Sequence, residues 1–446
     1  MSDIIIAGAG HGGLTAAIHL AAAGHKVTIF EKNKKGECGL DQVDAFDASA
    51  MEYAGLEIPE RYRAPANVIT FVPLEEDAPS VTLPGSKNYE NLMADRKDLF
   101  EYLASEAEKA GAEFVYGCEI KSPIVLGSRV AGISTSLGSF YGDMVIDACG
   151  VNSPVRSNLP DFMHIDKTVK KYEVLHSYRA VFNRDPDGTM PDTHYNIFIS
   201  DDGTEGLTWL IDDDTEVDAL ICRFPETDYA DVAHSLNRLK VKNSGMGTEL
   251  IRGGSLKDIP VRQPLAILVA DGYAAVGDSA FMTYAIKGSG IAYSLMAGTM
   301  LARVINADEI GLYTAETLWE YERSFYKEIG FSACRIAVMK GLLPYLTAQE
   351  VSDMFRCGLV SSEELQQIAD EGLSGVLKGG LIQFIGDKIK ALGEVPELRS
   401  KLLDMVGWLR KFTVIEPLLP NKYSREDAEK WAEKYNEVFE TIRRKD

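Results

Sequence analysis

A glycine-rich turn near the start of the chain constrains the fold more than any other feature. Residues 8–13 read G-A-G-H-G-G, which is the pattern G-x-G-x-x-G. The apolar run 4–7 precedes the turn, a helical pattern over 14–23 follows it, and a second apolar run ends at Glu31. Strand, glycine turn, helix, strand and acid in this order predict a βαβ unit that binds a dinucleotide.

The positions within this turn have separate physical reasons. Gly8 allows the tight turn, Gly10 lets a pyrophosphate approach the backbone, and Gly13 lets the helix pack closely on the strand. The free N–H groups and the positive dipole end of the helix favour phosphates. Glu31 follows Gly13 by 31 − 13 = 18 residues, close to the spacing of about 20 at which a carboxylate accepts ribose hydroxyls. The predicted cofactor contacts here are Gly8, Gly10, His11, Gly12, Gly13 and Glu31.

Composition narrows the class of protein. The chain has 446 residues, 46% of them hydrophobic, and is expected to fold into two or three globular domains. A formal net charge of −21 disfavours nucleic acid and anionic membranes as partners. The apolar stretch 4–24 lacks a basic leader and contains two histidines, so we expect neither a signal peptide nor a transmembrane segment.

The cysteines and histidines are scattered along the chain. Six cysteines are widely spaced, with no C-x-x-C pair and no cluster with histidine. This pattern predicts no metal site. Without a secretion signal, the cysteines are expected to be reduced thiols of a cytoplasmic protein.

Periodicity gives a coarse map of the chain. We expect helices over 44–55 and 95–110, and a largely helical region beyond residue 310. Strands are predicted over 68–72, 81–83, 114–120, 129–134 and 140–146. An alternating meander over 194–200, 207–211 and 219–224 predicts an antiparallel sheet inserted between nucleotide-binding segments, which is typical of a substrate domain.

A second glycine site follows the first by 277 − 8 = 269 residues. Gly277-Asp278 ends an apolar strand, and a further glycine turn opens a helix at Ile291. This arrangement fits one discontinuous domain that binds extended FAD. Asp278 would accept from the ribityl hydroxyls, and the helix N-terminus would face the flavin edge that becomes negative on reduction. The predicted contacts are Gly277, Asp278, Gly288, Ser289, Gly290 and Ile291.

Several motifs around this second site resemble one family. They are I-P-V-R-Q-P at 259–264, D-G at 271–272, V-G-D-S-A at 276–280, G-S-G-I at 288–291 and A-G at 297–298. The chain resembles the geranylgeranyl reductase family of FAD-dependent oxidoreductases, in the p-hydroxybenzoate-hydroxylase-like fold group. The resemblance extends to Arg96, to the D-x-x-G-x-x-S-x-x-R segment 147–156, to Leu207-Thr208-Trp209 and to 318–330. It covers roughly the first 330 residues.

The resemblance implies an α/β fold: a discontinuous Rossmann-like FAD-binding domain of glutathione-reductase type, an inserted antiparallel-sheet substrate domain and a C-terminal helical region. We expect the FAD-binding domain over 1–65, 95–160 and 255–310, the substrate domain over 66–94 and 161–254, and the helical region over 311–446. Arg96 corresponds to an FAD-contacting arginine. Lys32, next to Glu31, and Ile120, at the end of the predicted strand 114–120, complete the predicted cofactor contacts.

The resemblance also implies a reaction in which reduced FAD gives a hydride from N5 to one carbon of an alkene and a proton reaches the other. Glu37-Cys38-Gly39-Leu40 is the nearest match to a Cys-Gly-Glu-Gly segment near the flavin. Cys38 is therefore a candidate proton donor or flavin-face residue, and the alternative is a thiol that only packs in its loop.

Two candidate catalytic residues depart from the family pattern. Tyr284 replaces an asparagine, and Lys287 stands where a small neutral residue is usual. Lys287 either stabilises anionic reduced flavin, binds an acidic substrate or points to solvent. Because these positions lie where substrate meets flavin, they indicate a relative that changed its substrate.

Three aromatic residues of the meander are candidates for lining an apolar substrate cavity: Tyr195, Phe198 and Trp209. Ordinary sheet packing is the alternative for each of them. We therefore expect an FAD-dependent oxidoreductase that saturates or introduces a carbon–carbon double bond in an apolar or mixed small molecule. The direction stays open, as does the electron donor, which is NAD(P)H, a ferredoxin or another reductant.

Two other functions compete with this one. The first is an NAD(P)H-dependent monooxygenase of the same fold group, although Phe281 and Ala285 stand where hydroxylases place histidine and proline. The second is a non-catalytic flavin electron-transfer subunit whose C-terminal helices contact a partner.

Overall fold

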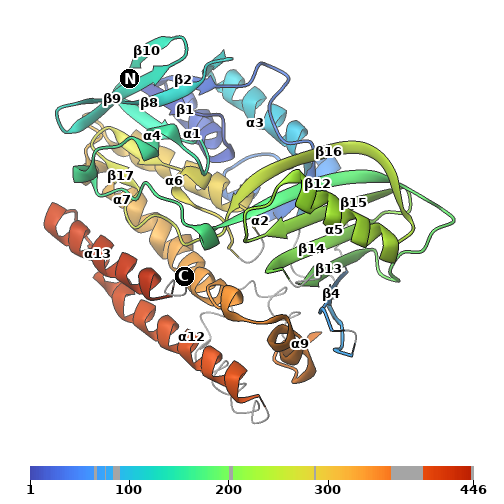
Figure 1. Ribbon diagram of the computed structural model, residues 1–446. Helices are drawn as coiled ribbons and strands as arrows, with labels where there is room; N and C mark the ends of the chain where they lie inside the picture. The colour runs from blue at the N-terminus through green and yellow to red at the C-terminus, as the bar shows by residue number, and fades with distance from the viewer. Residues whose placement is uncertain are drawn as a thin grey trace.

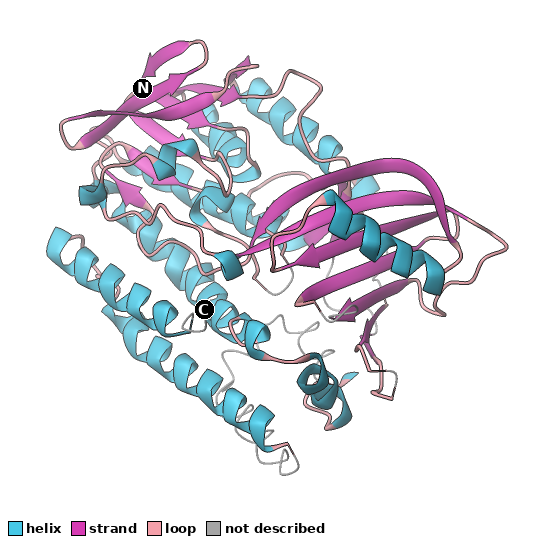
Figure 2. Ribbon diagram, in the orientation of Figure 1, coloured by secondary structure: helices cyan, strands magenta, loops and turns pink. Residues whose placement is uncertain are grey.

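Two regions rich in β-structure lie side by side, and long helices flank one of them (Figures 1 and 2). The computed structural model describes residues 1–64, 68–75, 77–83, 91–199, 204–285, 288–362 and 395–442. In Figure 1 the sheet that contains the N-terminal strands lies at the upper left, a larger antiparallel sheet lies at the right, and the C-terminal helices lie at the lower left.

A six-stranded sheet forms the first region. Its strands, in spatial order, are β17 (Val269–Ala270), β18 (Tyr273–Ala275), β11 (Met144–Asp147), β1 (Asp3–Ala7), β2 (Lys26–Glu31) and β7 (Glu113–Tyr116). All neighbours pair in parallel except β17 and β18. Ile4 to Ala7 of β1 are buried because this strand lies within the sheet with neighbours on both sides.

Helix α1 (His11–Ala22) packs on this sheet, and α3 (Arg96–Ala110) and α6 (Ile291–Ala307) pack on α1. Asp95 caps α3 by accepting from the N–H groups of Lys97 and Asp98, and Gly111 ends it with φ of +106°. Helices α1 and α6 cross closely, since a Cβ added to Gly298 would lie 2.2 Å from the Gly12 carbonyl oxygen. The predicted helix over 95–110 is confirmed to within one residue.

A seven-stranded sheet forms the second region. Its strands, in spatial order, are β16 (Met246–Pro260), β12 (Val174–Arg184), β15 (Glu216–Arg223), β14 (Gly206–Asp212), β13 (Tyr195–Ile199), β4 (Ile69–Val72) and β5 (Val81–Leu83). Its neighbours are antiparallel except β13 and β4. The meander predicted over 194–224 is confirmed as β13, β14 and β15.

The two faces of this sheet have different neighbours. Helix α5 (Tyr229–Lys242) covers the outer face, where Phe198, Leu210 and Ala219 join one apolar cluster. Side chains alternate along a strand, so Ile199, Leu207 and Trp209 point the other way and pack on the large core shared with the six-stranded sheet. We call this second face the inner face.

The segment 44–55 differs from its prediction. Strand β3 (Val43–Asp47) occupies its start, and a short helix, α2 (Ala48–Tyr53), follows. Strand β3 pairs antiparallel with β6 (Asn91–Asp95), about fifty residues further along the chain. The helix predicted over 44–55 was therefore wrong for residues 44–47, which form a strand because they pair with the distant β6.

Several smaller elements complete the chain before α6. They are a three-stranded antiparallel sheet of β8 (Ile120–Leu126), β9 (Arg129–Thr135) and β10 (Gly138–Tyr141), helix α4 (Pro154–Ser157), and the short helical turns η1 (Glu60–Tyr62), η2 (Asp161–Met163), η3 (Lys171–Glu173) and η4 (Gly277–Ala280).

Where the structure describes it, over 311–362 and 395–442, the C-terminal region is largely helical, as predicted. Its elements are α7 (Ala315–Phe325), the π-helical segment η5 (Tyr326–Gly330), α8 (Phe331–Lys340), η6 (Leu343–Tyr345), α9 (Ala348–Arg356), α12 (Pro396–Ile415), η7 (Glu416–Leu418) and α13 (Arg425–Ile442). Buried hydrogen bonds tie them to the rest: Trp431 Nε1 donates to the Ala266 carbonyl at 3.0 Å and Tyr435 Oη to that of Pro264 at 2.7 Å.

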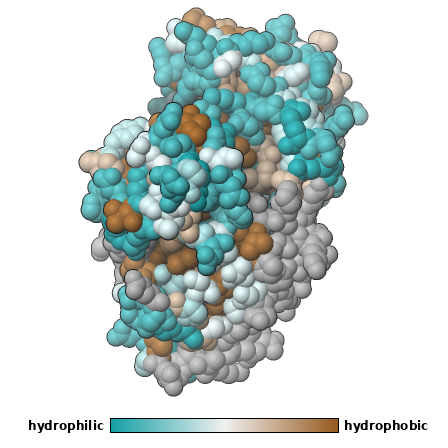
Figure 3. Space-filling model, turned by 90° about the vertical axis from the view of Figure 1, so that its right-hand side faces the viewer, coloured by the Kyte–Doolittle hydropathy of each residue, from teal (hydrophilic) through white to brown (hydrophobic). Residues whose placement is uncertain are grey.

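Within the part of the chain that the structure describes, no single helix combines the length and apolar composition needed to span a bilayer. One bent pair, Ala315–Tyr345 with Ala348–Arg356, meets the length and composition requirement jointly. The face of the molecule on the side of the seven-stranded sheet is largely hydrophilic, with groups of hydrophobic residues in its middle (Figure 3).

Candidate functional site

The turn between β1 and α1 closes on the end of the neighbouring strand β11. Gly8 has φ of +84°, and a Cβ there would lie 2.7 Å from the Ala148 carbonyl oxygen. A Cβ on Gly10 would lie 2.8 Å from the same oxygen, and one on Gly13 2.6 Å from the Ala148 Cβ. Each glycine therefore serves a close approach, and the Gly8 conformation is one that other residues rarely adopt.

The amino end of α1 is open to an anion. Gly10 is its N-cap, no side chain caps it, and its first turn contains no acidic residue. A helix start of this kind leaves backbone N–H groups without intrahelical partners, and the helix dipole favours negative charge there. These features fit the pyrophosphate of a dinucleotide.

Glu31 ends β2 beside this turn. Its carboxylate accepts from the Ala9 N–H at 3.2 Å and from the Asn33 N–H at 2.9 Å. A carboxylate offers about four acceptor positions, so these two bonds aim the group and leave capacity for ribose hydroxyls. Lys32 follows in an exposed position, and Ile120 begins β8 as a buried residue.

The second glycine site meets the first, although 269 residues separate them in the chain. A Cβ on Gly12 would lie 2.6 Å from Val276 Cγ2, just before Gly277, and 3.0 Å from the carbonyl oxygen of Ser294 in α6. Gly277 itself has φ of +67°. The structure thus brings together the amino ends of α1 and α6 and the turn η4, as one bound FAD requires.

Asp278 lies in this shared region, and Arg96 acts on it. Burial raises the pKa of the Asp278 carboxyl, opposed by the positive charge of Arg96 and a hydrogen bond from Thr283 Oγ1 at 3.1 Å. A Cβ on Gly290 would lie 2.9 Å from Asp278 Oδ1. Arg96 keeps its buried Nε without a hydrogen-bond partner among the described residues. An orphaned buried donor of this kind fits an oxygen-rich cofactor.

His11 is half-buried in the glycine turn. Burial lowers the pKa of its imidazole to about 3, and the positive charge of Arg96 acts in the same direction. The side chain is therefore neutral at physiological pH, so the positive charge available to phosphates here comes from Arg96 and the helix dipole.

Asp147 at the end of β11 holds the two halves of the site in register. Its carboxylate accepts from Ser279 Oγ and from Tyr273 Oη, both at 3.0 Å. Arg156 Nη1 donates to the Ser279 carbonyl at 2.6 Å. The D-x-x-G-x-x-S-x-x-R segment thus holds the turn η4 through hydrogen bonds from both of its ends to Ser279. The sequence did not predict this role.

The candidate catalytic residues are described in part. Lys287 lies outside the described residues. Tyr284 N–H donates to the Ser289 carbonyl at 2.9 Å, and burial raises the pKa of its phenol. Burial and the charges of Glu31 and Glu101 raise the pKa of the Cys38 thiol to about 11, and its Sγ lies 3.5 Å from the Lys34 carbonyl oxygen. The Cys38 thiol therefore lies close enough to Glu31, the predicted ribose contact, to be affected by its charge.

Tyr195 and Trp209 lie together on the inner face. Their ring centroids are 5.8 Å apart at 80°, and the Arg179 guanidinium lies 5.0 Å from the Trp209 ring centre. Trp209 Nε1 is buried without a hydrogen-bond partner among the described residues. Phe198 points to the outer face instead, against the cluster under α5, so it does not share their surface.

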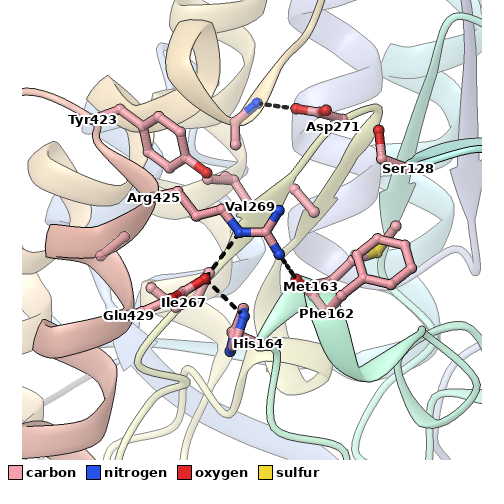
Figure 4. A pocket seen from close by; sticks show the side chains of 13 residues that line it. Ser128, Phe162, Met163, His164, Ile267, Val269, Asp271, Tyr423, Arg425 and Glu429 are labelled. Carbon is pink, nitrogen blue, oxygen red and sulfur yellow. Dashed lines mark hydrogen bonds and ion pairs between the residues drawn. The ribbon is translucent and has the colours of Figure 1, made fainter.

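A pocket at the other end of the six-stranded sheet is separate from this site (Figure 4). It lies between α13, η2 and β17, and Glu429 there bridges His164 Nε2 and Arg425 Nε, both at 2.9 Å. Asp271, in the turn before β18, accepts from the Ala315 N–H. Ligands of parallel sheets bind at the carboxyl ends of the strands. This pocket lies instead near the amino end of β18.

No group of three or more His, Cys, Asp and Glu side chains in the described ranges is arranged to hold a metal ion. The side chains that converge are instead those suited to a phosphate- and hydroxyl-rich ligand.

Comparison with known proteins agrees with this geometry. Residues 3–41 match the model of the FAD binding domain family. A digeranylgeranylglycerophospholipid reductase from Sulfolobus acidocaldarius is 22% identical over 431 residues, covering 92% of this chain and 91% of that protein. A probable electron transfer flavoprotein-quinone oxidoreductase from Escherichia coli is 25% identical, covering 72% and 80%.

The fold is shared with solved structures. A geranylgeranyl bacteriochlorophyll reductase-like protein from Thermoplasma acidophilum superposes with a TM-score of 0.71 at 20% identity, covering 91% of this chain and 99% of that one. Fold and site together define an FAD-dependent oxidoreductase. Among such enzymes, the chain resembles the geranylgeranyl reductase family, as its motifs predicted.

Proposed function

We propose that this FAD-dependent oxidoreductase reduces carbon–carbon double bonds in an unsaturated isoprenoid lipid. The relatives named for digeranylgeranylglycerophospholipid support this substrate class, and the departures at Tyr284 and Lys287 concern which lipid of the class is bound. The direction is reduction, and the electron donor is an external reductant such as NAD(P)H or a ferredoxin.

The observation that carries the proposal is a group of apolar side chains on the inner face, which also carries Arg179 and Asp218, beside the second glycine site. Ile199, Leu207 and Trp209 turn toward the shared core. Ile259, at the end of β16, reaches that site, since a Cβ on Gly288 would lie 3.2 Å from its Cγ2. An apolar chain lying on this face would therefore pass the flavin-facing loop, and apolar walls there would exclude water.

The protein groups supply binding and protons. Bound FAD, once reduced, supplies the hydride for one carbon of the double bond. Burial raises the pKa values of Tyr284 and Cys38, so at neutral pH each holds its proton, at Oη and at Sγ respectively. Tyr284, whose backbone N–H bonds to Ser289 of the predicted flavin-facing turn, therefore suits delivery of a proton to the second carbon, whereas Cys38 lies near Glu31, the predicted ribose contact. Trp209 and Tyr195 would orient the chain.

A single-turnover experiment tests the proposal. The protein is reduced with dithionite without oxygen and mixed with a diether phospholipid carrying geranylgeranyl chains. The flavin absorbance should return, and each lost double bond should add one H₂ to the lipid mass. The matched control is the same headgroup on saturated chains, which should leave the flavin reduced.

A second candidate, electron transfer to a quinone, is favoured by the relative from Escherichia coli. The same reduced protein would then be reoxidised by a soluble quinone but not by any alkene. A hydroxylated product that forms only with oxygen would instead indicate a monooxygenase. Either result would refute alkene reduction.

A further inference from the structure

A charged cluster joins the inner face of the seven-stranded sheet to the cofactor site. At its centre is Asp44 in β3. Its Oδ1 accepts from Arg179 Nη1 at 2.7 Å, and its Oδ2 accepts from Arg96 Nη1 at 2.9 Å. Burial alone would raise the pKa of Asp44, but the two positive charges hold it below its ordinary value. One ionised carboxylate is thus shared by Arg96, at the start of helix α3, and Arg179, on strand β12.

The Arg179 end is fixed to the predicted substrate residues. Arg179 is 8% exposed, and its Nε donates to both carboxylate oxygens of Asp218, at 2.9 and 3.1 Å. Its guanidinium also lies over Trp209, which packs edge-on against Tyr195. A ligand that shifts Trp209 would therefore also shift the guanidinium of Arg179, which packs on its ring.

The Arg96 end is fixed to the predicted cofactor contacts. Its backbone N–H donates to the Gln42 carbonyl at 2.9 Å, and Gln42 Nε2 donates to Asp44 at 3.1 Å. The positive charge of Arg96 acts on both His11 and Asp278, one from each glycine site. Its unpartnered Nε leaves one donor for the cofactor.

We propose that Arg179 is a positioning residue that acts through Asp44 on Arg96 and so couples the substrate face of the sheet to FAD binding. The coupling rests on the proposed function for its substrate end and on the predicted contact between Arg96 and FAD for the other. Without Arg179, the full negative charge of Asp44 faces Arg96 alone and offsets more of its positive charge. Less positive potential then reaches the cofactor.

The test measures FAD affinity and flavin potential rather than turnover. Apoprotein is titrated with FAD by fluorescence quenching, and the holoprotein midpoint potential is measured. Arg179→Gln should raise the FAD dissociation constant roughly tenfold, within the usual range of coupling between sites, and lower the potential. Arg179→Lys, which keeps the charge, should recover part of both. Arg96→Gln should weaken FAD binding most.

Arg184→Gln is the matched control. Arg184 lies on the same strand β12 and pairs with Asp212 at 3.0 Å, within the sheet. It should lower the stability of the sheet but leave FAD affinity unchanged. In an Asp44→Asn background, Arg179→Gln should add little, because the path through Asp44 is already broken.

Three results would overturn the proposal: equal effects of Arg179→Gln and Arg184→Gln, a full effect of Arg179→Gln in the Asp44→Asn background, or an unchanged dissociation constant for Arg96→Gln. Failure of alkene reduction is a separate outcome. If FAD affinity still responds to Arg179 while no alkene is reduced, the link from Arg179 through Asp44 to FAD stands and only the substrate end of the coupling falls.

Discussion

Burial decides the protonation state of His11, a residue within the first glycine turn. Burial and Arg96 lower its pKa to about 3 in the folded protein, against about 6.5 in an unfolded chain. Between these two values the unfolded chain takes up a proton that the folded chain does not. The free energy of unfolding of the FAD-free protein should therefore fall as pH drops from 6.5 toward 3.

At pH 5 this loss should reach about 2 kcal/mol. Replacing His11 with Asn removes the titrating group, so the variant should show a flatter dependence in that window. Urea unfolding of both proteins at several pH values measures the difference. Parallel curves for the two proteins would show that His11 is not held neutral.

At the scale of single residues, sequence reasoning found those that belong to a motif of neighbouring residues. Gly8, Gly10 and Gly13 were predicted because a turn that binds phosphates needs them at that spacing, and their contacts with Ala148 give each a steric reason. Asp44 and Arg179 were not predicted, since 135 residues separate the two partners of that ion pair. Only the folded chain brings them together.

The crossing of α1 and α6 gives a prediction about elements. A Cβ on Gly298 would meet the Gly12 carbonyl oxygen at 2.2 Å, so Gly298→Ala should force the two helices apart. We expect a loss of about 2 kcal/mol in the free energy of unfolding and a lower flavin content after purification. Thermal unfolding and flavin absorbance measure the two effects.

Gly407 in α12 provides the control. A Cβ there would meet nothing within 4 Å, so Gly407→Ala should raise stability by up to about 1 kcal/mol and leave the flavin content unchanged. If both variants kept the same flavin content, the close contact between α1 and α6 would not be needed for flavin binding.

Elements were predictable where their cause lies within the element. Helix α3 has a capping aspartate, an apolar stripe and a terminal glycine, and all three are readable in order. Strand β3 was mistaken for part of a helix, because its pairing with β6 is what makes it a strand. The predicted domain boundaries and site residues remain predictions that the cofactor-bound protein would test.

The whole molecule depends on the C-terminal helices as part of its core. Trp431 is 1% exposed and packs on Tyr326 and Tyr435, with ring centroids 5.5 and 5.3 Å away. Trp431→Ala should cost about 3–5 kcal/mol. Because its indole also bonds to Ala266, urea unfolding followed by flavin fluorescence and by circular dichroism should shift together.

Val414→Ala on the exposed side of α12 is the comparison for this prediction. Val414 is 72% exposed, so its replacement should change stability by less than about 0.5 kcal/mol. Separate transitions for the two probes in Trp431→Ala would mean that the C-terminal helices form an independent unit.

The distance in sequence between the two glycine sites also sets an order of events during synthesis. The amino end of α1 leaves the ribosome early, but the turn at Gly277 and helix α6 that cover it emerge some 270 residues later. At about 5–20 residues per second, the nascent chain waits many seconds with half of its coenzyme site uncovered. Coenzyme capture is therefore a late step of biogenesis, and a ribosome that stalls before residue 277 leaves a chain unable to enclose the flavin.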